Sequence, residues 1–346
     1  MTTKVRFDRT FSRLNFMRRR QPTVSVLMAS FNHAPFVAEA ITSVLSQSLT
    51  NIELIVVDDA SNDRTAEIVA SICDERLKLI CQPFNRGVHV RNLALSLARG
   101  RYIAFQNSDD VWQLDKLARQ LEVMEANDNL TACFTGVELI DVDGNAKKNS
   151  WGDNLFTVEN RLPRAWLRHF FDVGNCLALP SAMVRRSDLV KLGGFRGSLV
   201  QLSDFDLWIR LAALGDFMVL PMQLTKMRIV DGVNLSEPSA GKILRMKIEH
   251  ATVLQRFTEP ELLTYFPISF PDLVDFGNAG ARKVALALRA MERFGTTGIM
   301  FADCVIANVL DEERARADAI EAHGLAFIQD FFERRCQMVM LITKTK

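Results

Sequence analysis

Two hydrophobic periods alternate along the first 130 residues of the chain. Short runs that are apolar on both faces predict four buried strands, at residues 24–28, 54–57, 77–81 and 102–105. After each run, apolar side chains recur at three- to four-residue spacing, which predicts helices at residues 36–45, 68–72, 90–97 and 114–124. Such doubly apolar strands, alternating with helices, are typical of an α/β protein whose mostly parallel central sheet is covered by helices on both faces.

The pattern changes beyond residue 130. Further strands are predicted at residues 131–140, 176–185, 217–220 and 226–230, and helices at residues 187–192 and 204–214. Residues 146–175 look irregular. From about residue 240 the chain is helical, and its apolar stripes, such as Val284 to Met291, predict either core packing or an interface with a second copy that would form a homo-oligomer.

Length and composition narrow the class of protein. The 346 residues exceed the usual size of one compact domain, and we predict three segments: a basic arm over 1–21, an α/β domain over 22–238 and a helical region over 239–346. With 48% hydrophobic and 24% charged residues, the chain is not disordered, collagenous or a disulfide scaffold. The near-balance of 42 basic and 41 acidic residues gives no reason to expect nucleic acid as a partner.

The cysteines, the apolar stretches and the local charge of the chain indicate in which cellular compartment the protein lies. Six widely spaced cysteines, no apolar stretch of about 18 residues and no secretory signal pattern predict a cytoplasmic protein. Residues 1–20 carry seven basic side chains and one acidic side chain. This arm is either solvated or attracted to an anionic membrane face, which would make the protein peripheral at the inner face of the membrane.

Four polar clusters follow the four predicted strands: residues 30–32, 58–59, 83–87 and 107–110. Right-handed crossovers place the carboxyl ends of parallel strands along one edge, where open α/β sheets bind ligands. Carboxylates crowded there call for a compensating cation, and Mg²⁺ or Mn²⁺ prefers oxygen ligands shared with substrate phosphates. The alternative for any single aspartate is a helix N-cap.

Seven short motifs occur in order between residues 22 and 236. They are Val24–Asn32, Val56–Ser61, Asn85-Arg86-Gly87 with Arg91-Asn92, Asn107–Trp112, Gly193-Gly194-Phe195, Ser203–Trp208, and Arg228 with Asn234 and Ser236. In this order and spacing they resemble the inverting family 2 glycosyltransferases of the GT-A fold, which use nucleotide-diphospho-sugar donors. The resemblance implies a UDP-sugar as donor and a hydroxyl of a glycan or lipid-linked acceptor.

The resemblance also implies roles for single residues. Asp204 matches the general base, and Asp109 matches the carboxylate that coordinates the divalent metal. Asn107 and Asp110 would contact the donor sugar or bound water. Trp208 would pack beneath the acceptor or in the core. The nucleotide-binding set comprises Ser30, Phe31, Asp58, Arg86, Arg91 and Ser108. Within this set, the two arginines would approach the diphosphate or else form surface ion pairs.

Three positions depart from the family pattern. Asn107 stands where the family usually has Asp, Val230 replaces the His of a late Arg-x-His motif, and Ser203 replaces the Glu before the base. A second hypothesis is therefore a non-catalytic GT-A-like partner or scaffold in a polysaccharide assembly complex. A nucleotidyltransferase is disfavoured because no basic, glycine-rich loop follows the first strand. The pair Asp58-Asp59 follows the second strand, whereas in a receiver domain such a pair follows the first.

Overall fold

The computed structural model describes residues 21–148, 155–156, 158–230 and 240–344, with side chains up to residue 335. The predicted basic arm, the motif residues Asn234 and Ser236, and the side chains of the apolar run 338–342 lie outside the described residues. Their predicted roles stay predictions.

The described strands form one eight-stranded sheet in the order β3-β2-β1-β4-β7-β6-β8-β5. Its strands are β1 Val24–Ser30, β2 Ile52–Asp58, β3 Leu77–Cys81, β4 Tyr102–Asn107, β5 Val111–Trp112, β6 Leu130–Ile140, β7 Met183–Arg185 and β8 Asp216–Arg228. β1 is central and pairs in parallel with β2 and β4. In that register Ser30 lies beside Asp58, and Ala29 beside Asn107, so the polar clusters do share one edge.

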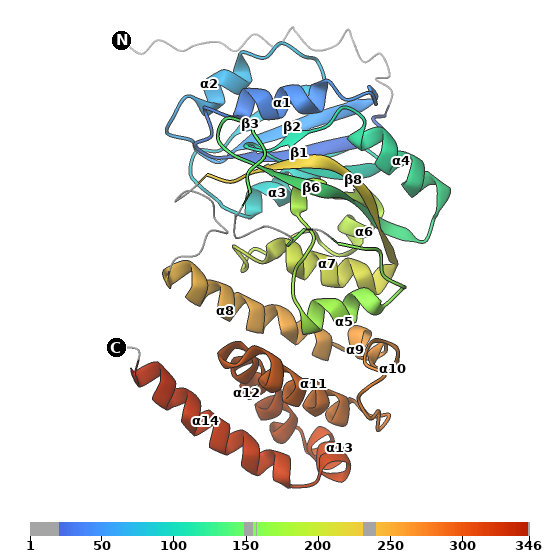
Figure 1. Cartoon of the computed structure of the whole chain (residues 1–346), viewed down its shortest axis with the longest axis vertical. Helices are drawn as coiled ribbons and strands as arrows, with labels where there is room; N and C mark the ends of the chain where they lie inside the picture. Colours follow the sequence, from blue (N-terminus) through green and yellow to red (C-terminus); the bar gives the residue numbers. More distant parts are fainter. Residues whose placement is uncertain (1–20, 149–154, 157, 231–239, 345–346) are drawn as a thin grey trace, which may run out of the picture.

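Helices cover both faces of the sheet (Figure 1). One face packs against α1 Val37–Leu45, α2 Thr65–Ala70 and α4 Lys116–Ala126. The other packs against α3 His89–Leu97, α5 Ala165–Asp172, α6 Arg186–Lys191 and α7 Ser203–Leu214. Because alternate side chains of a strand point to opposite faces, Val26 of β1 joins the first core and Leu27 the second. The predicted fold class is confirmed.

Several local predictions in the second half were wrong. Residues 176–185 form a strand only at Met183–Arg185, because a 3₁₀ turn at Leu179–Ser181 contains Pro180, which has no backbone N–H to donate. The predicted strands 217–220 and 226–230 are a single strand, β8, which continues past Pro221.

A register shift explains why β8 continues. Opposite Pro221 and Met222, the pairing slips between Thr135 and Gly136 of β6. A Cβ on Gly136 would lie 3.1 Å from the Met222 carbonyl oxygen, so the absence of a side chain there accommodates the irregularity.

Two elements had no signal in the sequence. Residues 146–175, predicted as irregular, contain α5, whose Trp166 and Phe170 are buried. β5 has only two residues, Val111 and Trp112, too few to show a period, and it pairs with β8.

The C-terminal region consists of helices that lie below α7 in the view of Figure 1. Its principal helices are α8 Ala240–Leu254, α9 Pro260–Leu263, α10 Phe266–Ser269, α11 Ala279–Phe294, α12 Thr296–Asp311, α13 Glu313–His323 and α14 Ala326–Lys344. Val284, Leu286 and Met291 are buried in the core that also contains Trp208 of α7, so the core-packing alternative is confirmed for both the stripe and this tryptophan. No described helix is long and apolar enough to cross a lipid bilayer.

Candidate functional site

The carboxyl ends of β1 and β2 are joined by the Asp58 carboxylate. Asp58 Oδ1 accepts hydrogen bonds from Ser30 Oγ at 3.0 Å and Ser61 Oγ at 2.6 Å, and Oδ2 accepts one from the Ser61 amide at 3.0 Å. These bonds hold two turns in the left-handed region, with φ of 54° at Asn32 and 61° at Ala60. Left-handed backbone at a residue with a β-carbon costs on the order of 1 kcal/mol and persists only where surrounding contacts impose it.

Asp59 fixes the loop that follows β3. Its two carboxylate oxygens accept hydrogen bonds from the backbone amides of Arg86, at 2.6 Å, and Gly87, at 2.8 Å. The Arg86 guanidinium is exposed and lies over the Phe84 ring, 4.7 Å from its centroid. Phe31, at the end of β1, is 41% exposed. At the carboxyl ends of β1 and β3, an aromatic ring, Phe31, and a cation, Arg86, are therefore exposed to solvent.

His33 is a site residue that the sequence analysis missed. Its Nδ1 lies 2.8 Å from Ser108 Oγ and 4.0 Å from Asp109 Oδ1. It follows directly after the strand-end run Ser30 to Asn32, and that position was the only available signal. The turn after β1 thus places an imidazole beside the predicted metal carboxylate.

Both carboxylate oxygens of Asp110 are hydrogen-bonded to neighbouring residues. Its Oδ1 accepts a hydrogen bond from the Arg228 amide at 2.8 Å, and its Oδ2 accepts one from the Asn107 side chain at 2.8 Å. Burial and the neighbouring Asp109 carboxylate hold the pKa of Asp110 well above its usual range. These contacts favour a role for Asp110 and Asn107 in holding the ends of β4 and β8 together.

Arg228, at the end of β8, connects the segment that contains Asp109 and Asp110 to neighbouring segments through hydrogen bonds. Its guanidinium donates to the backbone carbonyls of Asp109, Asp141 and Val142, and to Glu39 of α1. The side chain is 1% exposed. A cation buried here also offsets part of the negative charge of the two aspartates.

The residues present fit a weakly held divalent ion. The Asp109 side chain is 15% exposed, its pKa is raised by burial, and His33 and Ser108 are its polar neighbours. One accessible carboxylate with few other protein ligands suits Mg²⁺ or Mn²⁺, which draws further ligands from water and substrate phosphates. Within the described residues, no group of three or more His, Cys, Asp or Glu side chains could form a site by itself.

The Asp204 carboxylate lies in the first turn of α7 and is not its N-cap, a position held by Leu202. Asp204 Oδ1 accepts a hydrogen bond from the Phe205 amide at 2.8 Å, and Asn175 Nδ2 lies 3.4 Å from Oδ2. Burial raises the pKa of Asp204 to about 6, although the Phe205 amide and the nearby Arg91 act in the opposite direction. Such a carboxylate is mostly ionised at neutral pH and basic enough to accept a proton.

Arg91 and its neighbour Asn92 connect α3 to this part of the site. Burial lowers the pKa of Arg91, and its Nη1 lies 3.5 Å from Ser203 Oγ. The Asn92 side chain exchanges two hydrogen bonds with the Phe195 backbone, at 2.7 and 2.8 Å. Gly194, with φ +72°, allows that approach, because a Cβ there would lie 2.4 Å from Asn92 Oδ1. Two of the predicted motifs are therefore one structural unit.

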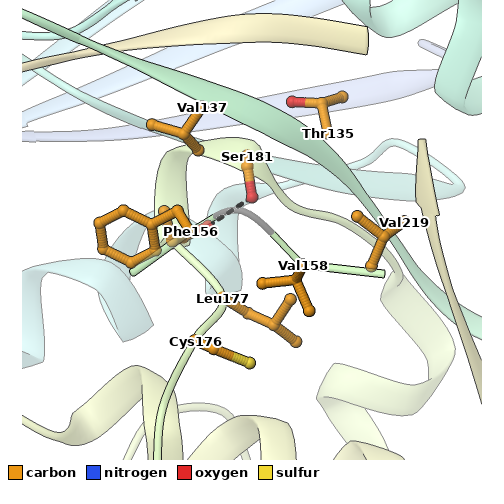
Figure 2. A pocket seen from close by; sticks show the side chains of 9 residues that line it. Thr135, Val137, Phe156, Val158, Cys176, Leu177, Ser181 and Val219 are labelled. Atoms are coloured by element: carbon orange, nitrogen blue, oxygen red, sulfur yellow. Dashed lines mark hydrogen bonds between the residues drawn. The ribbon is translucent and has the colours of Figure 1, made fainter. Parts of the chain in front are cut away.

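A narrow crevice adjoins the Asp204 side of the site. Figure 2 shows it between β6 and the segment that contains Cys176 and Leu177, lined mainly by apolar side chains. The segment directly follows Asn175, which contacts Asp204, and Trp208 of α7 donates to the Leu177 carbonyl at 3.2 Å. The segment that lines this crevice is therefore linked to α7 through Asn175 and Leu177.

The fold and the site geometry agree with a family comparison. The model of the family described as Glycosyl transferase family 2 matches residues 25–186. This chain belongs to that family. As a family 2 glycosyltransferase, it carries Ser30, Asp58 and Asp109 within the matched range and Asp204 and Arg228 beyond it.

Two named relatives illustrate the similarity of this family 2 glycosyltransferase to other proteins. It is 41% identical over 131 residues to the putative teichuronic acid biosynthesis glycosyltransferase TuaG of Bacillus subtilis (strain 168), covering 37% of this chain and 52% of TuaG. It is 40% identical over 118 residues to the Escherichia coli UDP-Glc:alpha-D-GlcNAc-diphosphoundecaprenol beta-1,3-glucosyltransferase WfgD, covering 34% of this chain and 46% of WfgD. The chain spans about half the length of the curated relatives it matches.

The likeness to solved structures covers most of the chain, including part of the C-terminal helical region. S. aureus TarS in complex with UDP-GlcNAc aligns with a TM-score of 0.56 at 18% identity, over 89% of this chain and 92% of that one. The mannosyltransferase PcManGT from Pyrobaculum calidifontis, in complex with GDP-Man and Mn²⁺, aligns with a TM-score of 0.53 at 17% identity, over 93% and 88%. At these identities the likeness concerns the fold alone.

Proposed function

We propose that this chain is an inverting glycosyltransferase that moves a sugar from a UDP-sugar to a hydroxyl of a glycan or lipid-linked acceptor. The observation that carries this proposal is the position of Asp204, on the first turn of α7 with Asn175 beside it, where burial raises the pKa of the carboxyl to about 6. UDP-GlcNAc is bound by the structural neighbour TarS, and the relative WfgD is named for a UDP-Glc donor and a diphosphoundecaprenol acceptor.

The proposed reaction is a direct displacement. The acceptor oxygen forms a bond to the anomeric carbon as the bond from that carbon to the diphosphate oxygen breaks, and the configuration inverts. Asp204 takes the proton of the acceptor hydroxyl, and the electron pair of the broken bond leaves with UDP. The positive charge of the nearby Arg91 favours the ionised form of Asp204 and so opposes part of the effect of burial.

Turnover with a panel of donors tests the proposal. With purified full chain, Mn²⁺ and an undecaprenyl-diphosphate-linked acceptor, we expect UDP release from UDP-Glc or UDP-GlcNAc and a β-linked product by NMR. Release of GDP from GDP-Man alone would assign a different donor class. Nucleotide binding without turnover of any donor would favour the non-catalytic partner hypothesis instead.

We propose that Asp109, with His33 alongside, holds the divalent ion together with the donor diphosphate. When bound, the ion would supply positive charge to the departing diphosphate. The acidic oxygens of Asp110 are already hydrogen-bonded to Asn107 and Arg228, which leaves Asp109 as the accessible carboxylate of the pair.

Asp109→Asn should therefore weaken Mn²⁺-dependent UDP binding at least tenfold, measured by isothermal titration with and without Mn²⁺. The reason is that an amide is a neutral and weaker ligand for a hard cation than a carboxylate. Asp115→Asn, an exposed change before α4, is the matched control and should bind as the unmodified chain does. Equal UDP affinity with and without Mn²⁺ in the unmodified chain would contradict a metal at Asp109.

A further inference from the structure

The first two turns of α8 carry an apolar surface that is exposed within the part of the chain that the structure describes. Residues 240–248 are almost all exposed, whereas Ala251, Val253 and Leu254 in the second half of the helix are buried. Four large apolar side chains are exposed on these two turns, to 38, 59, 43 and 47%: Ile243, Leu244, Met246 and Ile248. Contiguous exposed apolar side chains of this kind mark interaction surfaces more often than isolated ones do.

The same two turns are basic. Between Ala240 and Ile248 the sequence has three basic residues, Lys242, Arg245 and Lys247, and no acidic residue. A helix that combines basic with large apolar side chains is typical of segments that lie in the interface of an anionic bilayer. We define these two turns, residues 240–248, as the α8 patch.

The α8 patch is connected to the loop before the candidate base. Glu249, the next residue, accepts hydrogen bonds from the backbone amides of Val200, Gln201 and Leu202, at 3.0, 2.8 and 2.9 Å. This loop leads directly into α7 and Asp204. Val200 is itself 45% exposed, and in Figure 1 α8 lies directly below α7. The patch therefore adjoins the Asp204 side of the molecule.

We propose that the α8 patch binds the surface of an anionic lipid bilayer and so holds the Asp204 loop close to that surface. The apolar side chains would enter the interface, and Arg245 and Lys247 would meet the phosphate headgroups. Binding of the patch to itself in a second copy is disfavoured, because a two-fold contact would bring both sets of cations together. The benefit to catalysis rests on the proposed lipid-linked acceptor, but the membrane contact does not.

Vesicle co-sedimentation of the full chain tests this surface. We expect binding to phosphatidylcholine vesicles that contain phosphatidylglycerol, and at least tenfold weaker binding to phosphatidylcholine alone. Leu244→Ser with Ile248→Ser, and separately Arg245→Glu with Lys247→Glu, should each weaken binding to the anionic vesicles at least tenfold. Leu114→Ser is the matched control, because Leu114 is 59% exposed, as is Leu244, and lies elsewhere; it should bind as the unmodified chain does.

Further measurements separate the alternatives. Release of UDP from a UDP-sugar in detergent-free buffer should be the same in the patch variants and the unmodified chain. If turnover fails while vesicle binding behaves as expected, only the proposed function is wrong. Unchanged vesicle binding in both patch variants, or loss only on replacing Arg18, Arg19 and Arg20 of the basic arm, would overturn the proposal. A dimer in light scattering that the patch variants dissociate would assign the patch to a second copy and overturn it too.

Discussion

Asp204→Asn is expected to lower the turnover number by on the order of 10²–10⁴-fold while nucleotide-sugar binding persists. The amide keeps the shape of the side chain and can still accept a hydrogen bond from the Phe205 amide, so α7 and its neighbours should stay in place. It cannot accept the proton of the acceptor hydroxyl, and the step that needs a base therefore fails. The measurement is steady-state UDP release alongside titration of the donor. Retained turnover would contradict the assignment of Asp204 as the base.

The pH profile gives the same residue a second test. Because burial raises the pKa of Asp204 to about 6, the base is protonated and inactive below that value and ionised above it. The rate should fall roughly tenfold per pH unit below about pH 6 and reach a plateau above it. A profile that stays flat down to pH 4.5 would exclude a base with this pKa. Asp115→Asn should leave the profile unchanged, since that side chain is exposed and precedes α4, whereas Asp204 lies on α7.

Asp206→Ala is expected to lower the free energy of unfolding by about 3–5 kcal/mol, the usual cost of removing one partner from a buried ion pair. Asp206 is fully buried and accepts hydrogen bonds from Arg210 at 2.8 Å and from Arg256 at 2.7 Å. Without it, Arg210 and Arg256, which are 7% and 12% exposed, lose the carboxylate that lies between them, although Arg256 keeps its ion pair with Glu259. Urea denaturation, followed by circular dichroism, measures the loss.

The two aspartates of α7 provide controls for each other. Asp204→Asn should leave the free energy of unfolding at pH 7 unchanged or slightly higher. The raised pKa of Asp204 means that folding disfavours its ionised form, and the amide removes that charge. Asp206→Ala with Arg256→Leu should recover part of the lost stability, because one of the two buried cations that faced the Asp206 carboxylate is then gone. Equal stability of Asp206→Ala and the unmodified chain would show that the Arg210–Asp206–Arg256 cluster is not structural.

Much of the polar edge of the sheet could be predicted, because each strand and helix that forms it shows its own hydrophobic periodicity in the sequence. Four runs that are apolar on both faces, separated by helices, predicted β1 to β4 and the shared edge at which they end, and hence the neighbourhood of Ser30, Asp58 and Asp109. Elements without a period of their own were missed or wrongly divided. α5 lies in an irregular stretch, and β8 was divided at Pro221 because the compensating Gly136 lies on another strand.

Contacts between residues far apart in the sequence could not be predicted from hydrophobic periodicity. His33 meets Asp109 across 76 positions of sequence, and Glu249 reaches back to the loop before Asp204. Nothing local to either residue distinguishes it from a surface side chain. The C-terminal helices were predicted as a separate region over 239–346, yet Arg256 of this region forms an ion pair with Asp206 of α7.

The sequence by itself determined the α/β class, the polar edge of the sheet and the residue types gathered there. The reason is that burial of neighbouring positions imposes a period on each strand and helix, and the handedness of crossovers then orders the strand ends. Only the tertiary structure decided which carboxylate of each pair is accessible and which is held by partners. Asp109 and Asp110 are adjacent, and Asp204 and Asp206 share one turn. Their different surroundings come from Arg228, Arg210 and Arg256, which reach them only after the whole core has packed.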